Sequence, residues 1–177
     1  MEQSGQRRFG HWSGGFIASV LLLGAAVRAE NVAVNRVLIP GPIGFIVQNA
    51  ILGAMTRLER PQCAALFEEF QAADGSPLAA HLSRLALTPS QYLRTLWFAD
   101  GDDMKRCHAY PTPVAFTASG NTVVYVCSAH FASMFGRNRP YAEITLIHEV
   151  LHAAGLGENP PTSAYISRAA WAKCATR

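Results

Sequence analysis

The sequence predicts one α+β domain behind a short export signal. The chain has 177 residues, of which half are hydrophobic and 15% are charged, as expected of one globular domain with a hydrophobic core. After residue 30 the apolar residues recur first at helical spacing, then in short β-type runs, and then at helical spacing again. We therefore expect N-terminal helices, a small antiparallel sheet and a buried helix that carries the functional site.

The first 29 residues have the pattern of a signal peptide. Arg7 and Arg8 provide a positive segment, residues 16–27 form a short apolar segment, and cleavage is expected before Glu30. The apolar run of about 12 residues is too short for a membrane span, which needs roughly 20. We therefore expect a secreted or periplasmic protein whose domain comprises residues 30–177, with no stable membrane span after cleavage.

The distribution of charge argues against a nucleic-acid partner. The formal net charge is +3, but three arginines and one acid lie in the first 29 residues. The rest of the chain has 12 basic and 11 acidic residues, without a basic stripe. The sequence carries no signal for an oligomeric state.

Four cysteines, an even number, lie after the signal and contain no CxxC pair, which argues against a cysteine metal site. In an oxidising compartment they predict two disulfides. Three pairings are possible, and we favour one between Cys127 and Cys174, which would hold the C-terminal tail against the rest of the domain.

Three helices are predicted in the N-terminal half, after an extended lead-in at residues 30–44. Apolar residues recur at near-helical spacing in 46–59, and Pro61 interrupts the pattern. A second helix is expected at 64–73 and a third at 78–87, the latter ended by Thr88-Pro89.

Strands are predicted in the middle of the chain. Residues 92–98 are rich in aromatic and aliphatic side chains. Residues 114–117 and 122–127 are β-type runs joined by Ser119-Gly120-Asn121, which predicts a hairpin. A helical turn is expected at 129–135.

The clearest predicted helix spans Tyr141–Ala154 and ends at Gly155. A last helix is expected at Ser163–Cys174, with Thr162 or Ser163 as its N-cap. The helix at 141–154 is apolar on nearly all sides, so we expect it to be buried.

This helix contains the sequence His148-Glu149-Val150-Leu151-His152. Residues four apart lie on one face of a helix, so the two imidazoles can bind one ion. Glu149 lies about 100° around the helix from His148 and can reach a water at that ion. Buried histidines beside a buried acid could also be plain core residues, but a buried charged glutamate needs a partner, and a divalent cation supplies one.

A third protein ligand is expected at Glu158. Gly155 can end the helix in a left-handed turn that returns Glu158 to the two imidazoles. Glu158 could instead be a solvated loop acid. The competing third ligands are His130, His108 and Asp100 or Asp102. Glu143 is excluded because it lies about 180° around the helix from His152.

Residues 144–158, with the spacing HExxHxxGxxE, resemble the zincin metallopeptidases and in particular the metzincin pattern. Residues 123–127 also resemble a segment of the deuterolysin-like secreted peptidases, and the general layout agrees over about 120–174. Two features depart from metzincins: their third ligand is usually His, and no methionine follows Glu158 here. The resemblance therefore extends to the zincin superfamily and not to a named family within it.

The resemblance implies a zinc metallopeptidase with one Zn²⁺ per chain, bound by His148, His152 and Glu158. Glu149 would be the general base, and Tyr165 would stabilise the oxyanion, with Tyr141 and His130 as alternatives. A strand at 122–126 beside the cleft would pair with a peptide or protein substrate.

Two functions follow from these patterns. The first is a secreted zinc-dependent peptide hydrolase, and the alternative is a non-catalytic, zinc-stabilised extracytoplasmic binding module. A purely structural site has no need of Glu149 and usually closes the fourth position with another Cys or His, which favours the hydrolase.

Overall fold

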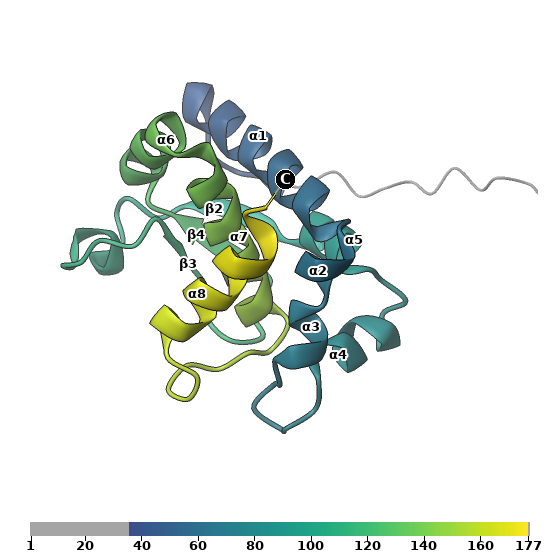
Figure 1. Ribbon diagram of the computed structural model, residues 1–177. Coiled ribbons are helices and arrows are strands. Elements are labelled where there is room, and N and C mark those ends of the chain that lie inside the picture. Colours follow the sequence, from purple (N-terminus) through teal and green to yellow (C-terminus); the bar gives the residue numbers. More distant parts are fainter. Residues whose placement is uncertain (1–35, 177) are drawn as a thin grey trace, which may run out of the picture. The chain divides into compact units, whose positions relative to one another are not determined.

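The computed structural model describes residues 36–176, and these residues belong to one compact unit (Figure 1). The predicted signal peptide lies outside the described residues. Among the helices that are described, none combines the length and the apolar character needed to cross a membrane. The described part contains both helices and a small four-stranded sheet, so the predicted α+β class is confirmed.

Helix α1 (Gly41–Leu58) is the first long helix. It begins five residues before the predicted helix, because Pro42 lies in the first turn, where a helix tolerates a proline. Its buried face includes Val47, Ile51 and Ala54. This face packs against the helix that carries the site, so α1 forms the wall behind that helix.

Three short helices follow α1: α2 (Pro61–Ala64), α3 (Leu66–Glu69) and α4 (Leu78–Arg84). The helix predicted at 64–73 is therefore wrong in extent. The chain leaves the helix at Phe70 and turns at Asp74, whose carboxylate accepts hydrogen bonds from the backbone N–H and the hydroxyl of Ser76. This local turn competes successfully with the helix.

The strand predicted at 92–98 is wrong over most of its length. Helix α5 (Pro89–Thr95) occupies it, and only β2 (Trp97–Asp100) is a strand. The reason is a capping box, in which the Thr88 hydroxyl accepts from the Gln91 N–H and the Gln91 side chain accepts from the Thr88 N–H. Thr88-Pro89 thus begins a helix as well as following one.

The sheet has the strand order β1-β2-β4-β3. The other three strands are β1 (Arg36–Val37), β3 (Ala115–Phe116) and β4 (Val123–Val126). The predicted hairpin is confirmed, because β3 and β4 pair antiparallel. The expectation of an antiparallel sheet is corrected, because β1 pairs with β2 and β2 with β4 in parallel. These parallel pairs are joined by long connections, as parallel pairing requires.

The C-terminal half is helical. It contains the short 3-10 helix η1 (Lys105–His108), α6 (Ser128–Arg137), α7 (Arg139–Ala153) and α8 (Ser163–Cys174). Both long helices predicted here are confirmed. The Asn138 side chain caps α7 by accepting from the Tyr141 N–H, and the Thr162 side chain caps α8 by accepting from the Tyr165 N–H.

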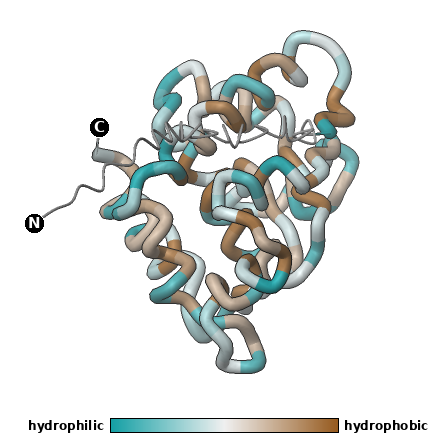
Figure 2. The backbone as a smooth tube through the Cα atoms, turned by 90° about the vertical axis from the view of Figure 1, so that its right-hand side faces the viewer, coloured by the Kyte–Doolittle hydropathy of each residue, from teal (hydrophilic) through white to brown (hydrophobic). Residues whose placement is uncertain are grey.

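Helix α7 lies at the centre of the fold. It contacts α1, α6 and α8, and it also contacts the strands β3 and β4. Eleven of its 15 residues are buried, as its apolar circumference predicts. In Figure 2 hydrophobic and hydrophilic segments alternate along the helical turns, as expected of helices that bury one face.

Two disulfides form, Cys63–Cys174 and Cys107–Cys127, and no cysteine is free. The favoured pairing of Cys127 with Cys174 is therefore wrong. The last turn of α8 lies against α2, where Cys63 is located, and Arg57 and Arg60 both donate to the carbonyl of Cys174, at 2.6 and 2.5 Å. The end of the chain is held in place, as predicted, but through Cys63.

Candidate metal centre

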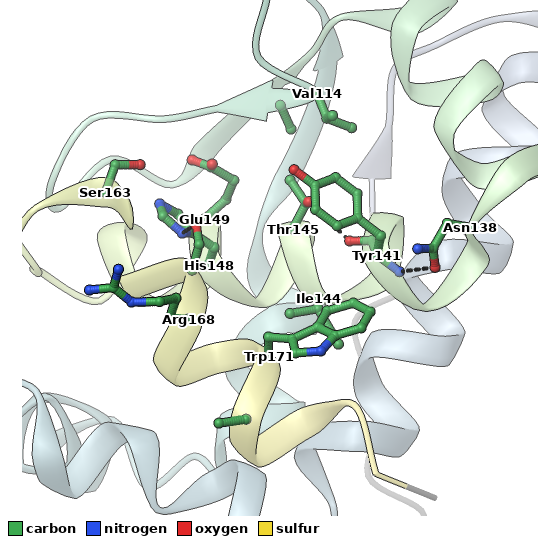
Figure 3. Close-up of a pocket in the computed structure, with 13 residues that line it drawn as sticks. Val114, Asn138, Tyr141, Ile144, Thr145, His148, Glu149, Ser163, Arg168 and Trp171 are labelled. Atoms are coloured by element: carbon green, nitrogen blue, oxygen red, sulfur yellow. Dashed lines mark hydrogen bonds between the residues drawn. The ribbon is translucent and has the colours of Figure 1, made fainter. Parts of the chain in front are cut away.

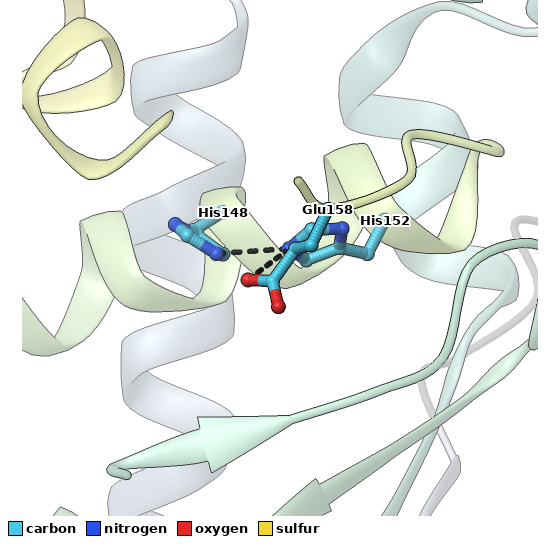
Figure 4. A group of neighbouring side chains, drawn as sticks. All are labelled: His148, His152 and Glu158. Atoms are coloured by element: carbon cyan, nitrogen blue, oxygen red, sulfur yellow. Dashed lines mark hydrogen bonds and ion pairs between the residues drawn. The ribbon is translucent and has the colours of Figure 1, made fainter. Parts of the chain in front are cut away.

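Helix α7 places His148, Glu149 and His152 next to one another in the interior. Their exposed fractions are 7%, 6% and 5%. The two Nε2 atoms face each other at 3.0 Å, as the i, i+4 spacing predicts (Figure 4). The interior therefore holds two imidazoles with their ring nitrogens directed at one point.

Gly155 ends α7 and turns the chain back toward the imidazoles. Its φ of 116° is strained for residues with a side chain, and its N–H donates to the carbonyl of His152. Three residues later, Oε1 of Glu158 lies 3.5 Å from Nε2 of His152. Figure 4 shows the Glu158 carboxylate directed at the two imidazole rings.

These three residues form a group that could hold a metal ion. Their ligand atoms all lie within 4.8 Å of one another. A tetrahedral ion with bonds of about 2 Å separates its ligand atoms by roughly 3.3 Å, so the spacing fits after small adjustments. In the part of the chain that the structure describes, this is the one group of at least three His, Cys, Asp or Glu residues with such spacing.

Each imidazole is oriented by its other ring nitrogen. Nδ1 of His152 lies 2.8 Å from the carbonyl of Leu156, which can only accept, so this nitrogen carries the proton and Nε2 keeps its lone pair. Nδ1 of His148 lies 3.1 Å from the hydroxyl of Ser167 on α8. Such bonds to the second nitrogen fix the ring orientation that a metal ligand needs.

Glu149 lies beside the histidines without an ion pair. Burial raises the pKa of its carboxyl to about 8, although the backbone N–H of Thr117 and the positive charge of Arg106 lower it. The pKa of His148 is lowered to about 3, mainly by burial and to a smaller extent by the electrostatic effect of the neighbouring His152. A pKa near neutrality suits a group that accepts and returns a proton.

The competing third ligands lie elsewhere. His130 bonds through Nδ1 to the carbonyl of Pro113, and Asp100 accepts from Ser128. His108 and Asp102 are not part of the ligand group either. The exclusion of Glu143 agrees with its position, because it binds Arg57 and Arg139 on another side of the helix.

Among the three expected oxyanion donors, only Tyr141 lines a cavity at the site. Tyr165 is 54% exposed, and its ring lies edge-on to that of Phe70 at a centroid distance of 6.2 Å. His130 is also absent from the two cavities. The structure thus does not bring Tyr165 to the ligand group.

The site opens into two adjoining cavities. One, of about 260 Å³, includes the three ligands together with Arg106 and Ser119. The other, of about 730 Å³, extends along α7 and α8 (Figure 3). Glu149 lines both, so this residue lies where the two cavities meet.

Sequence reasoning missed Ser167, Arg106 and Arg168. Ser167 bonds to His148, Arg106 lines the smaller cavity, and Arg168 lines the larger one. Arg106 is placed by η1, which the disulfide of Cys107 joins to the start of α6. No local pattern marks these residues, because each reaches the site through tertiary packing.

The strand beside the cleft is β3 and not the predicted strand at 122–126. β4, which occupies that segment, is paired on both sides, with β2 and with β3. β3 is an edge strand, and its residue Ala115 lines both cavities. Only an edge strand has free N–H and C=O groups for another chain.

Comparison with known proteins gives no match: no family model, no curated protein and no solved structure matches this chain significantly.

Proposed function

We propose that this protein is a secreted, zinc-dependent peptide hydrolase. The observation that carries the proposal is the convergence of His148, His152 and Glu158 on one point, with the carboxyl of Glu149 beside it. Two imidazoles and one carboxylate are a donor set of catalytic zinc, which keeps its fourth position open. The cavities at the ligand group leave room for that position. We expect one zinc ion per chain.

The proposed chemistry divides between the ion and Glu149. Zinc, when bound, polarises the carbonyl of the scissile peptide bond and lowers the pKa of the attacking water. Glu149 takes a proton from that water and then delivers it to the leaving amine. The position of Glu149 supports both steps, because it lines both cavities beside the ligand group.

Other residues would hold the peptide and its developing charge. The edge strand β3 offers backbone groups to an extended peptide along the cleft. Arg106, in the smaller cavity, and Tyr141, in the larger one, are better placed than Tyr165 to stabilise an oxyanion.

Secretion is supported by the N-terminal pattern and by the two disulfides, which are typical of oxidising compartments. We expect the mature protein to begin at Glu30. N-terminal sequencing of protein recovered from outside the cytoplasm checks this, and an intact N-terminus on the recovered protein would contradict it.

The central test compares zinc content and peptide cleavage in four proteins: wild type, Glu149→Gln, His148→Ala and Glu158→Ala. We expect Glu149→Gln to keep about one zinc per chain, because this residue is not one of the proposed zinc ligands. Its kcat/KM should fall at least about a thousandfold, because the amide cannot accept the proton of the attacking water. The two ligand variants should lose zinc.

The alternative, a non-catalytic module stabilised by zinc, predicts a different result. Zinc would then be retained by wild type, its removal would unfold the domain, and a diverse peptide library would remain uncut. Cleavage by Glu149→Gln at the wild-type rate would also contradict the proposed mechanism.

A further inference from the structure

The larger cavity is continuous with the ligand group. His148, Glu149, Ala115 and Ser163 line both this cavity and the smaller one. A peptide whose scissile bond lies at Glu149 therefore places an adjacent residue in the larger cavity. Its volume of about 730 Å³ lies within the range of roughly 300–1,000 Å³ that is typical of ligand pockets.

The walls of this cavity are largely apolar. The apolar lining residues include Val114, Ile144 of α7, and Trp171 and Ala172 of α8. In Figure 3 Val114 lies on the side opposite Ile144 and Trp171. Trp171 and Tyr141 are 42% and 41% exposed, with ring centroids 6.4 Å apart. Two large aromatic rings exposed at an apolar cavity favour the binding of a bulky apolar group.

One positively charged side chain, which is exposed to solvent, lines this cavity. Arg168 of α8 is the only Lys or Arg that lines the larger cavity. In the part of the chain that the structure describes, it has no ion pair, hydrogen bond or ring contact. Figure 3 shows its side chain extending away from Trp171, toward the side where Ser163 lies.

The guanidinium has no ion-pair partner in the cavity itself. Glu149 is the only acidic residue that lines this cavity, and among the described residues it forms no ion pair with Arg168. By contrast, Arg57 and Arg139 are both paired with Glu143. A carboxylate on a ligand would therefore find an unpaired partner in Arg168, with the paired geometry that guanidinium favours.

We infer that the larger cavity selects peptides in which a bulky apolar residue beside the scissile bond is accompanied by a carboxylate, which binds Arg168. The inference rests on the proposed function, because it names the substrate class of the same site. The carboxylate has two possible sources. It is either the chain-terminal carboxylate of the apolar residue or the acidic side chain of the next residue.

The test measures binding and not turnover. Short peptides are titrated into the full chain without metal, in the presence of a chelator, so that no carboxylate can bind an ion. The indole N–H signal of Trp171 is followed by NMR. Four acetylated peptides are compared: one ending in phenylalanine as free acid, its amide, an amide with phenylalanine followed by aspartate, and one ending in alanine as free acid.

We expect at least one of the two carboxylate-bearing phenylalanine peptides to bind about tenfold more tightly than the phenylalanine amide, the gain expected of one charge-assisted hydrogen bond. A preference for the free acid identifies the chain-terminal source, and a preference for the aspartate peptide identifies the side-chain source. The alanine peptide should bind more weakly than the phenylalanine acid. Equal binding of acid, amide and aspartate peptides would overturn the inference, as would the absence of any shift at Trp171.

Matched variants separate the two contacts. Arg168→Gln should abolish the preference for the carboxylate, while Arg137→Gln should keep it, because Arg137 is an exposed arginine of α6 that lines neither cavity. Trp171→Ala should reduce the preference for phenylalanine over alanine. Because this variant lacks the indole, its binding is measured by calorimetry, and thermal unfolding confirms that it is folded. If Arg168→Gln retains the preference, the inference is wrong.

The outcome is distinguishable from a failure of the proposed function. If the peptides bind selectively but the zinc-loaded protein cleaves none of them, the proposed hydrolase function is wrong and the proposed selectivity is supported. Cleavage of peptides without regard to the apolar residue or the carboxylate would do the reverse.

Discussion

Glu143 and Glu149 lie six residues apart in α7, and both are buried, with exposed fractions of 4% and 6%. Glu143 accepts from Nε of Arg57 at 2.8 Å and from Nε of Arg139 at 2.7 Å. Glu149 has no ion pair, and burial raises its pKa to about 8. The charge of Glu143 is thus balanced by two arginines, while Glu149 has no such partner and lines a cavity.

The comparison shows that burial alone does not identify a carboxyl group as a functional one. A buried carboxylate with two cationic partners links the helices from which these partners come. A buried carboxyl without such partners has a shifted pKa, which is typical of groups that transfer protons in active sites.

The first prediction removes the charge of Glu143. Glu143→Gln leaves two guanidinium groups without their carboxylate, and Arg57 is itself largely buried. We expect the free energy of unfolding to fall by about 3 kcal/mol, as measured by urea denaturation. Glu149→Gln is the matched control and should cause no comparable loss. Equal losses in the two variants would remove the distinction between the two acids.

The second prediction concerns Gly53 of α1, which lets Glu143 approach. A Cβ at Gly53 would overlap the carboxylate of Glu143. We expect Gly53→Ala to cost about 2 kcal/mol of unfolding free energy, because the ion pairs must shift. Gly136→Ala in α6, where a Cβ would meet nothing within 4 Å, is the control and should be neutral or stabilising. A stabilising Gly53→Ala would show that the pairs are not closely fitted.

The third prediction concerns the support of the ligand His148. Ser167→Ala removes the hydroxyl that lies 3.1 Å from Nδ1 of His148. We expect the affinity for zinc to fall about tenfold, as is typical for the loss of a bond to a ligand's second nitrogen, and competition with a chelator measures it. Ser163→Ala is the control, since Ser163 lines both cavities without a hydrogen bond to a ligand. An unchanged affinity in Ser167→Ala would show that α8 does not orient the imidazole.

The fourth prediction is a pH dependence of the metal-free protein. The folded pKa of Glu149 is raised from 4.5 to about 8, so the folded state binds the proton more tightly than the unfolded state. The stability from this group is present below pH 4.5 and is lost as the pH rises toward 8.

Between pH 6 and 7 we expect wild type to lose about 1 kcal/mol of unfolding free energy relative to Glu149→Gln, measured by urea denaturation with a chelator present. The lowered pKa of His148 has the opposite effect, but it is common to both proteins and cancels in the difference. Parallel pH profiles for the two proteins would contradict the prediction.

The local patterns of the sequence predicted much of the site. The i, i+4 spacing places the two imidazoles together, and the turn at Gly155 brings Glu158 to them. Both can be predicted because the residues involved lie within about ten positions of one another in the sequence. Contacts over long separations had no such signal. Arg57 and Glu143 are 86 residues apart, and Cys63 and Cys174 are 111 residues apart.

The errors in the fold have a related cause. Thr88-Pro89 has the pattern that ends a helix, but Thr88 and Gln91 form the capping box that begins α5. The pattern at 92–98 is compatible with a strand or a buried helix, and only this cap and the tertiary packing decide between them. The sheet was expected to be antiparallel because only its hairpin is encoded by adjacent residues.

Arg57 brings together parts of the chain that are synthesised at very different times. Its guanidinium donates to Glu143 of α7 and, through Nη1, to the carbonyl of Cys174 at the end of α8. The last helix also supplies Ser167 to the imidazole of His148. Assembly of the ligand group is therefore completed only when residues near 174 have emerged and docked, so a nascent chain lacking them holds the whole histidine motif without its supporting contacts.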